Sequence, residues 1–369
     1  MSTEKKTILI LANSTGGLCD FRGELVEALC ARYRVVVSVP DDLKKAQLEA
    51  MGCTLLHTPI DRRGTDPLTD LRLQRTYEAI LEDVRPAAVL CYTIKPNVYG
   101  GYACRKKKIP YLVTITGLGT AFEKKGLLRW VAETLYRRGL KGAGCVFFQN
   151  AENQRLFEER GLVSGRHRLV NGSGVNLQKH VPLPYPEEDD VVRFLQVGRA
   201  MKQKGTDEYL AAAQALHSDK VHFYMIGYSD EGYEEQLKEL GEKGVIYHLG
   251  FHTDVDPFYG AASAVVVASR HEGLSNVLLE GAACARPLLA SRIPGCVEAF
   301  EEGKTGLGFA PQNVPSLVDA LRRFLALSPA ERREMGLRGR AKMEKEFDRR
   351  QVTEAYLSEL RALLEEETA

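Results

Sequence analysis

The sequence has no long apolar run and almost no net charge. No stretch approaches the roughly 18 apolar residues of a membrane-spanning helix. The apolar run at residues 7–12 is too short for the core of a signal peptide. We therefore expect a cytoplasmic protein, which can still lie on a membrane. The net charge of +1 argues against a polycation built for nucleic acid.

The sequence also lacks paired cysteines. None of its eight cysteines forms a C-x-x-C pair, and most of them lie inside apolar runs. This placement is typical of reduced, buried thiols in a cytosolic protein. Because the spacings do not match those of zinc ligands, the sequence predicts neither disulfides nor a zinc site.

Short apolar runs alternate with longer segments of helical periodicity along the whole chain. A length of 369 residues favours two domains over one core. Continuous apolar strands separated by helices predict a parallel sheet covered on both faces. The expected fold class is α/β, with two doubly wound, Rossmann-like domains that face a central cleft. We expect strands at residues 7–12, 34–39, 87–91, 111–115, 145–148, 191–197, 221–226, 245–249, 264–268 and 287–290.

A segment without periodicity divides the two domains. Residues 181–190 contain three prolines and four acidic residues, which is typical of a linker. We place the N-terminal domain at residues 1–182, the linker at 183–190 and the C-terminal domain at 191–350. A last helix, at residues 351–369, is expected to pack back on the N-terminal domain.

Two adjacent glycines, Gly16 and Gly17, follow the first predicted strand and precede a helix. Adjacent glycines let the backbone approach a ligand closely, and the N-terminus of a helix favours an anion. The pattern is neither G-x-G-x-x-G nor a P-loop. A plain tight turn is an equal alternative.

A basic loop follows the first strand of the second domain. It contains Gly198, Arg199 and Lys204. Because the loop follows a strand, we expect Arg199 and Lys204 to point into the cleft and neutralise a diphosphate. The alternative is a solvated basic loop.

The most specific pattern, at residues 269–281, contains two glutamates eight residues apart. Eight residues are just over two helical turns, so Glu272 and Glu280 are expected to face one side. Gly273 would free N–H groups at the start of the helix, where a diphosphate is favoured. We expect Glu280 to accept hydrogen bonds from ribose and Glu272 from a sugar; the alternative is a capping glutamate and a salt-bridged one.

Together these patterns resemble the family-4 retaining glycosyltransferases, which have the GT-B fold. The Glu-(seven residues)-Glu signature of that family matches Glu272 and Glu280. Its Gly-Arg…Lys-Gly donor motif matches the basic loop that begins at Gly198, and its Gly-Gly loop matches Gly16 and Gly17. The resemblance implies that the first domain takes the acceptor and the second binds the nucleotide sugar.

The resemblance also implies a role for each matching residue. The departing diphosphate takes the acceptor proton, and no covalent enzyme intermediate is required. The enzyme must then stabilise the charge that grows on the diphosphate. We expect catalytic roles for Glu272, Arg199 and Lys204. We expect donor binding by Gly16, Gly17, Gly198, Gly273, Leu274, Ser275, Asn276 and Glu280.

A narrower resemblance lies at residues 91–100 and 114–119, which look like motifs of bacterial transferases that extend polyprenyl-diphosphate-linked saccharides. It implies transfer of a hexose or N-acetylhexosamine, with N-acetylgalactosamine the best guess, from a UDP-sugar to such an acceptor. Many family members have His-Gly where this chain has Thr116-Gly117, so we assign no catalytic histidine. The expected acceptor-binding residues are Lys95, Thr116 and Gly117.

A D-x-D sequence at residues 254–256 matches the motif of metal-dependent transferases of the GT-A fold. It lies between a predicted strand and a helix, where a helix-capping aspartate is expected. We therefore expect no cofactor and no tightly bound metal.

Basic residues concentrate between Lys95 and Lys141, where eleven Lys or Arg face two glutamates. Such a patch binds anionic lipid at about 1 kcal/mol per charge near the surface. Residues 126–140 have the pattern of an amphipathic helix. This helix either lies on the inner face of the cytoplasmic membrane or packs on its own sheet. The residues expected at the membrane are Leu127, Leu128, Arg129, Trp130, Arg137 and Arg138.

Three other functions stay open. A hydrolysing UDP-sugar 2-epimerase with this architecture would turn over donor without an acceptor. A non-catalytic subunit would bind the sugar nucleotide only. A soluble transferase would act on a free sugar or a protein. RNA binding is not expected, because no aromatic stacking platform is evident in the sequence.

Overall fold

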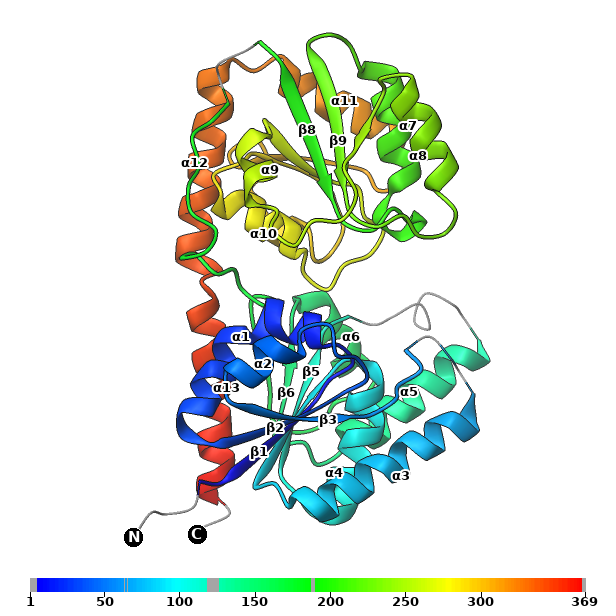
Figure 1. The fold of residues 1–369 in the computed structure, drawn as a ribbon, viewed down its shortest axis with the longest axis vertical. Coiled ribbons are helices and arrows are strands. Elements are labelled where there is room, and N and C mark those ends of the chain that lie inside the picture. Colours follow the sequence, from blue (N-terminus) through cyan, green and yellow to red (C-terminus); the bar gives the residue numbers. More distant parts are fainter. Residues whose placement is uncertain (1–4, 63, 65, 118–125, 187–189, 367–369) are drawn as a thin grey trace. The chain divides into compact units, whose positions relative to one another are not determined.

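The computed structural model describes residues 5–62, 64, 66–117, 126–186 and 190–366. The chain forms two compact units: unit 1 is Met1–Ser173 with Arg350–Ala369, and unit 2 is Gly174–Arg349. Each unit contains one parallel sheet with helices on both faces (Figure 1). The predicted class, α/β with two doubly wound Rossmann-like domains, is confirmed.

In unit 1 the described strands form one parallel sheet in the order β3-β2-β1-β4-β5-β6-β7. The order reverses beside β1, which pairs with β2 on one side and β4 on the other. Its central strands are apolar throughout because helices cover both faces. The strands are β1 (Thr7–Leu11), β2 (Arg34–Val39), β3 (Cys53–His57), β4 (Ala88–Tyr92), β5 (Tyr111–Ile115), β6 (Cys145–Phe148) and β7 (His167–Leu169).

Two apolar clusters flank this sheet. Helices α1 and α13 pack on one face, and α3, α4, α5 and α6 pack on the other. The helices are α1 (Thr15–Arg32), α2 (Lys45–Ala50), α3 (Pro67–Val84), the π-helical turn η1 (Pro96–Gly100), α4 (Gly101–Lys107), α5 (Leu127–Leu140), α6 (Ala151–Glu159) and α13 (Arg349–Glu366).

In unit 2 the described strands form a parallel sheet in the order β10-β9-β8-β11-β12-β13, which reverses beside β8. The strands are β8 (Val192–Val197), β9 (Val221–Ile226), β10 (Tyr247–His248), β11 (Ala264–Val267), β12 (Leu288–Ser291) and β13 (Gly306–Phe309). The helices are η2 (Lys202–Lys204), α7 (Thr206–Leu216), α8 (Glu234–Glu242), α9 (Asp256–Ala261), α10 (Asn276–Ala283), η3 (Val297–Ala299), α11 (Val314–Leu325) and α12 (Pro329–Glu346).

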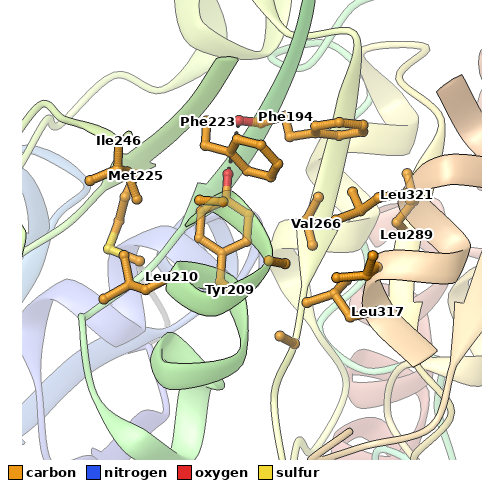
Figure 2. Packing of buried hydrophobic residues seen from close by; sticks show 14 of the residues in the cluster. Phe194, Tyr209, Leu210, Phe223, Met225, Ile246, Val266, Leu289, Leu317 and Leu321 are labelled. Carbon is orange, nitrogen blue, oxygen red and sulfur yellow. Dashed lines mark hydrogen bonds between the residues drawn. The ribbon is translucent and has the colours of Figure 1, made fainter. Parts of the chain in front are cut away.

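The core of unit 2 is built around a buried tyrosine. Figure 2 shows Tyr209 beside Phe194 and Phe223, with aliphatic side chains around the three rings. The Tyr209 hydroxyl donates to the carbonyl oxygens of Phe194 and Tyr224 at 2.9 and 3.0 Å. The buried hydroxyl of Tyr209 is therefore satisfied by backbone acceptors.

The division between the units differs from the expected boundary at residue 182. Residues 174–182 belong to unit 2, where Arg340 donates to the carbonyl oxygen of His180 at 2.7 Å. Helix α13 supplies buried side chains to the core of unit 1. In that core the hydroxyls of Tyr356 and Thr114 lie 2.7 Å apart.

Candidate active site

The residues expected to bind the donor diphosphate follow two neighbouring strands of unit 2. Arg199 and Lys204 follow β8, and Glu272 follows β11. The strand order reverses between these strands, and ligands of open α/β sheets bind outside the carboxyl ends at such a reversal.

Gly205 allows the loops that follow β8 and β11 to pack closely against each other. Gly205 has φ +69°, and a Cβ atom there would lie 2.0 Å from the carbonyl oxygen of Ala268. Any other residue is therefore excluded by both backbone strain and collision. The amide of Arg270 also donates to the carbonyl oxygen of Gln203 at 2.9 Å. Close packing of these loops brings Lys204 to Glu272.

Arg199 and Lys204 of the basic loop each already have a carboxylate partner. Lys204 Nζ lies 2.6 Å from Glu272 Oε1, which also accepts a hydrogen bond from Ser269 Oγ at 2.7 Å. Arg199 Nη1 lies 3.0 Å from Asp230 Oδ2. A diphosphate that binds here has to compete with these carboxylates or share the cations with them. The pairing also fixes the Glu272 carboxylate, as a sugar-orienting group requires.

Helix α10 carries the second glutamate of the signature. Glu280 Oε2 accepts a hydrogen bond from Tyr259 Oη at 3.0 Å. Burial raises the pKa of Glu280 above its ordinary value, and the charge of His180 opposes this shift. Asn276 Oδ1, in the first turn of α10, is buried and has no hydrogen-bond partner among the described residues. An orphaned buried acceptor at a helix start suggests that a ligand donor belongs there.

Two of the residues expected to bind the donor, Ser275 and Leu274, have groups that the protein itself already engages. The amide of Ser275 donates to the carbonyl oxygen of Gly295 at 2.7 Å, so it is not open to a ligand. The Leu274 side chain lies in the core of unit 2. Gly273 precedes them in the loop, and Gly198 follows β8 with φ +141°.

Sequence reasoning missed an aromatic pair at the same edge of this sheet. Tyr228 follows β9 and Phe251 follows β10; their rings stack 4.4 Å apart at an interplanar angle of 7°. The two residues are 59% and 51% exposed. A flat, exposed aromatic surface suits a nucleobase.

In unit 1, Gly16 and Gly17 form the first turn of α1 rather than a loop. The Ser14 hydroxyl accepts a hydrogen bond from the amide of Gly17 at 3.3 Å and caps the helix. The carboxylate of Asp41 accepts the amide of Thr15 at 3.3 Å. Both amides are therefore engaged by the protein, which leaves the Gly16 amide as the candidate for a ligand.

The expected acceptor residues line one pocket in unit 1. This pocket has a volume of about 250 Å³ and lies where the sheet order reverses, outside β1 and β4. Its cations are paired: Lys95 Nζ lies 2.6 Å from Asp70 Oδ1, and Arg62 Nη2 lies 2.7 Å from Asp41 Oδ2. Its lining residues are Asn13, Ile60, Arg62, Thr93, Ile94, Lys95, Pro96, Thr116 and Gly117.

One pocket residue, Thr93, has an unusual backbone. Its φ is +73°, in the left-handed region that β-branched residues rarely adopt. Its hydroxyl is buried, and no described part of the chain offers it a hydrogen-bond partner. Strain of this kind often occurs at functional sites. Together with the volume and the paired charges, it indicates a polar site for a sugar-sized ligand.

Only part of the apolar face of the predicted interfacial helix, α5, is exposed to solvent. In α5, Tyr136 and Leu140 are buried in unit 1, whereas Leu128, Trp130 and Val131 are 40%, 63% and 38% exposed. The later half of the apolar face therefore packs on the domain's own sheet. The first two turns expose apolar groups to solvent; the side chain of Leu127 lies outside what the structure describes.

The basic patch is weaker than the local sequence suggests. Acidic residues of α3 neutralise three of its lysines, because Asp70, Glu78 and Glu82 pair with Lys95, Lys106 and Lys107. Arg129 pairs with Glu133 at 3.0 Å, and Arg137 donates to the carbonyl oxygen of Gly161 at 3.3 Å. Arg138 lies over the ring of Tyr102. Lys124 and Lys125 lie outside the described residues.

The D-x-D sequence belongs to the start of α9. Asp254 Oδ1 accepts the amide of Asp256 at 3.2 Å, and Asp256 Oδ1 lies 2.6 Å from His180 Nδ1. His180, Asp256 and Cys284 form the one cluster of three potential metal ligands in the described parts of the chain. Asp254 therefore stabilises a turn, and Asp256 pairs with a histidine.

No helix in the described ranges is long and apolar enough to cross a bilayer.

Comparisons with known proteins agree with this geometry. Residues 16–172 match the model of the glycosyl transferase 4-like domain, and residues 192–326 match that of the glycosyl transferases group 1. Together the two models span both units.

One curated relative is the N,N'-diacetylbacillosaminyl-diphospho-undecaprenol alpha-1,3-N-acetylgalactosaminyltransferase of Campylobacter jejuni. It is 26% identical over 84% of this chain and 87% of its own. The putative glycosyltransferase EpsD of Bacillus subtilis is 24% identical over 67% of this chain and 69% of its own.

Solved structures share the fold across both units. Sucrose-phosphate synthase from Thermosynechococcus elongatus has a TM-score of 0.79 at 20% identity and covers 97% of this chain and 99% of its own. Anabaena HepE, solved with UDP and glucose, has a TM-score of 0.78 at 18% identity over 97% of this chain and all of its own. The chain belongs to the family-4, group 1 glycosyltransferases of the GT-B fold.

Proposed function

We propose that the protein is a retaining transferase that moves an N-acetylhexosamine, with N-acetylgalactosamine preferred, from UDP to a polyprenyl-diphosphate-linked saccharide. The observation that carries the transferase assignment is the array of Arg199, Lys204 and Glu272 at the sheet reversal of unit 2. The similarity to the N-acetylgalactosaminyltransferase of Campylobacter jejuni supports the choice of donor sugar and acceptor. The product would enter bacterial glycan or glycoprotein biosynthesis.

On the donor side, the two cations stabilise the charge that develops on the departing UDP. Lys204 shares its charge between Glu272 and the diphosphate, and Arg199 exchanges Asp230 for a phosphate oxygen. Glu272, fixed by Lys204 and Ser269, accepts hydrogen bonds from the sugar. Glu280 accepts from the ribose, and the Tyr228–Phe251 pair offers a surface for the base.

On the acceptor side, the unit 1 pocket takes the terminal sugar. Because Lys95 and Arg62 already have carboxylate partners, the pocket suits a neutral, hydroxyl-rich ring better than a bare anion. The acceptor hydroxyl attacks the anomeric carbon, the bond to UDP breaks, and the proton passes to the diphosphate. No side chain is assigned as acid or base.

We further propose that the protein lies peripherally on the inner face of the cytoplasmic membrane and needs no tightly bound metal. The exposed Leu128, Trp130 and Val131 of α5 support the first point. The use of the Asp254 carboxylate to stabilise the turn at the start of α9 supports the second. Transfer should persist in EDTA.

A radiolabel transfer assay tests the proposal. UDP-N-acetylgalactosamine, UDP-N-acetylglucosamine, UDP-galactose and UDP-glucose are offered with a polyprenyl-diphosphate-linked monosaccharide. We expect label from one donor in the lipid phase, and none with Glu272→Ala. Analysis of the anomeric linkage by NMR then decides between retention and inversion.

Other outcomes favour the alternatives. Donor turnover without an acceptor would indicate an epimerase-like reaction. UDP binding without turnover of any donor would indicate a sugar-nucleotide-binding subunit.

A further inference from the structure

We propose that Tyr259 is a positioning residue, whose hydroxyl fixes one oxygen of the Glu280 carboxylate so that the other faces the ribose of the donor. The inference rests on the proposed function for the ribose. It extends that function to a buried residue of α9, outside the signature that contains Glu280.

The position of the Tyr259 hydroxyl is set by the core of unit 2. Tyr259 is fully buried and packs in the cluster that contains Leu195, Val265 and Leu279. Its Oη donates to Glu280 Oε2 at 3.0 Å. A phenol ring held on all sides has no freedom to follow the carboxylate, so the carboxylate must orient toward the phenol.

The second oxygen of Glu280 is available to a ligand. Within the described parts of the chain, no protein donor bonds Oε1. Burial raises the pKa of Glu280, because an ionised carboxylate is costly away from water unless donors surround it. Tyr259 supplies one donor, and a ribose hydroxyl would supply another in the complex.

The charges around Glu280 favour its ionised form, but they do not take the place of the hydrogen bond from Tyr259. The charges of His180, Lys179 and Arg349 lower the pKa of Glu280. Asp256 pairs with His180, and Cys284 lies close to both. Among the described residues, the side-chain donor to the Glu280 carboxylate is Tyr259. Tyr259 therefore sets the direction of the carboxylate. The charged and titratable groups around it are Lys179, His180, Asp256, Cys284 and Arg349.

The test compares Tyr259→Phe with Tyr209→Phe. Tyr209 is a matched control, because it is also fully buried in unit 2 and its hydroxyl donates only to backbone carbonyls. Calorimetry measures the affinity of each protein for UDP, 2′-deoxy-UDP and 3′-deoxy-UDP. A hydrogen bond to a charged group corresponds to about a ten- to hundredfold change in affinity.

We expect Tyr259→Phe to weaken UDP binding by about tenfold or more and to lose most of the wild-type preference for UDP over a deoxy analogue. Tyr209→Phe should keep that preference. Unchanged UDP affinity in Tyr259→Phe, or equal losses for UDP and both deoxy analogues, would overturn the positioning role.

A measurement without nucleotide separates this inference from the proposed function. Tyr259 bonds the ionised form of Glu280, so its hydrogen bond stabilises the fold above the pKa of Glu280 and is lost below it. The Tm gap between wild type and Tyr259→Phe should therefore be largest near pH 8 and close as the pH falls. If the wild type binds no UDP, the proposed donor is wrong, while this gap still decides the role of Tyr259. A difference in Tm that does not change with pH would contradict the positioning role of Tyr259.

Discussion

At the scale of single residues, the proposed donor site is a set of charges that are already paired before a donor binds. Lys204 and Glu272 hold each other at 2.6 Å, so each removes the other's flexibility. This preorganisation is what makes a cation effective when charge develops on a leaving group. The pairing also means that loss of one partner leaves the other uncompensated.

Lys204→Ala should lower kcat by about 10²–10³, because it removes a preorganised charge next to the departing diphosphate. Lys202→Ala, an exposed lysine of the same turn, is the control and should stay near wild type. Steady-state transfer assays measure both variants. If both kept kcat within twofold of wild type, Lys204 would have no catalytic role.

The strained Thr93 allows a test of backbone conformation that is independent of side-chain chemistry. At ordinary φ, glycine destabilises relative to alanine by about 0.5–1 kcal/mol, but at positive φ the order reverses. Thr93→Gly should therefore be more stable than Thr93→Ala by about 1 kcal/mol. The same pair at Thr116, which has no positive φ, should show the ordinary order. Urea denaturation measures all four variants. If the glycine and alanine variants had the same order of stability at Thr93 as at Thr116, the result would contradict backbone strain at Thr93.

Proximity of Lys204 and Glu272 was predictable because their loops follow apolar strands that the sequence displays clearly. Arg62 and Tyr259 were not predictable. Arg62 follows β3, whose burial is incomplete, and it reaches the pocket only through the order of the sheet. Tyr259 bonds Glu280 across helices that no local pattern relates.

At the scale of elements, the apolar interior strands were predicted well and the edges poorly. β4, β5, β6 and β11 are buried throughout, so each gives a continuous apolar run. β7 is a short edge strand of three residues, and β13 contains two glycines. Neither has the periodicity or propensity that marks a strand. Helix α1 begins at Thr15, so it includes the two glycines that were expected to precede it, because Ser14 caps it.

The two halves of helix α5 differ in their exposure. Its last turns hold the helix on unit 1, and its first turns expose Leu128, Trp130 and Val131. Side chains exposed in this way cost little in water singly, but together they can enter the interface of a bilayer. Because α3 neutralises part of the basic patch, we expect apolar insertion to contribute more than charge.

Trp130→Glu should therefore abolish most flotation with anionic vesicles, and high salt should weaken wild-type flotation only partly. Leu337→Glu is the control: Leu337 is 47% exposed on α12 of unit 2. Flotation on a density gradient measures both variants and the wild type. If the two variants floated equally, or if the wild type did not float, α5 would not be a membrane contact.

At the scale of the whole molecule, the chain contains two cores, and one of them is built from both ends of the sequence. Unit 1 needs α13, which supplies Val352, Tyr356 and Leu360 to the face covered by α1. Glu359 of the same helix pairs with Arg166 and Arg168 at 2.6 and 2.8 Å. Unit 1 therefore cannot complete its core until the last helix is made, whereas the strands of unit 2 are contiguous in sequence.

This division predicts that damage to α13 stays within unit 1. Tyr356→Ala removes a ring that stacks on Phe147 and bonds Thr114, and it should cost about 3–5 kcal/mol of unfolding free energy. Hydrogen exchange should then show faster exchange in β1, β4 and β5, while β8 and β11 keep their protection because they belong to the other core. Arg361→Ala, which removes only an exposed pair with Glu354, should change neither set. Equal loss of protection in both sheets would mean that the units unfold as one cooperative body, and the two cores would then have to be treated as a single folding unit.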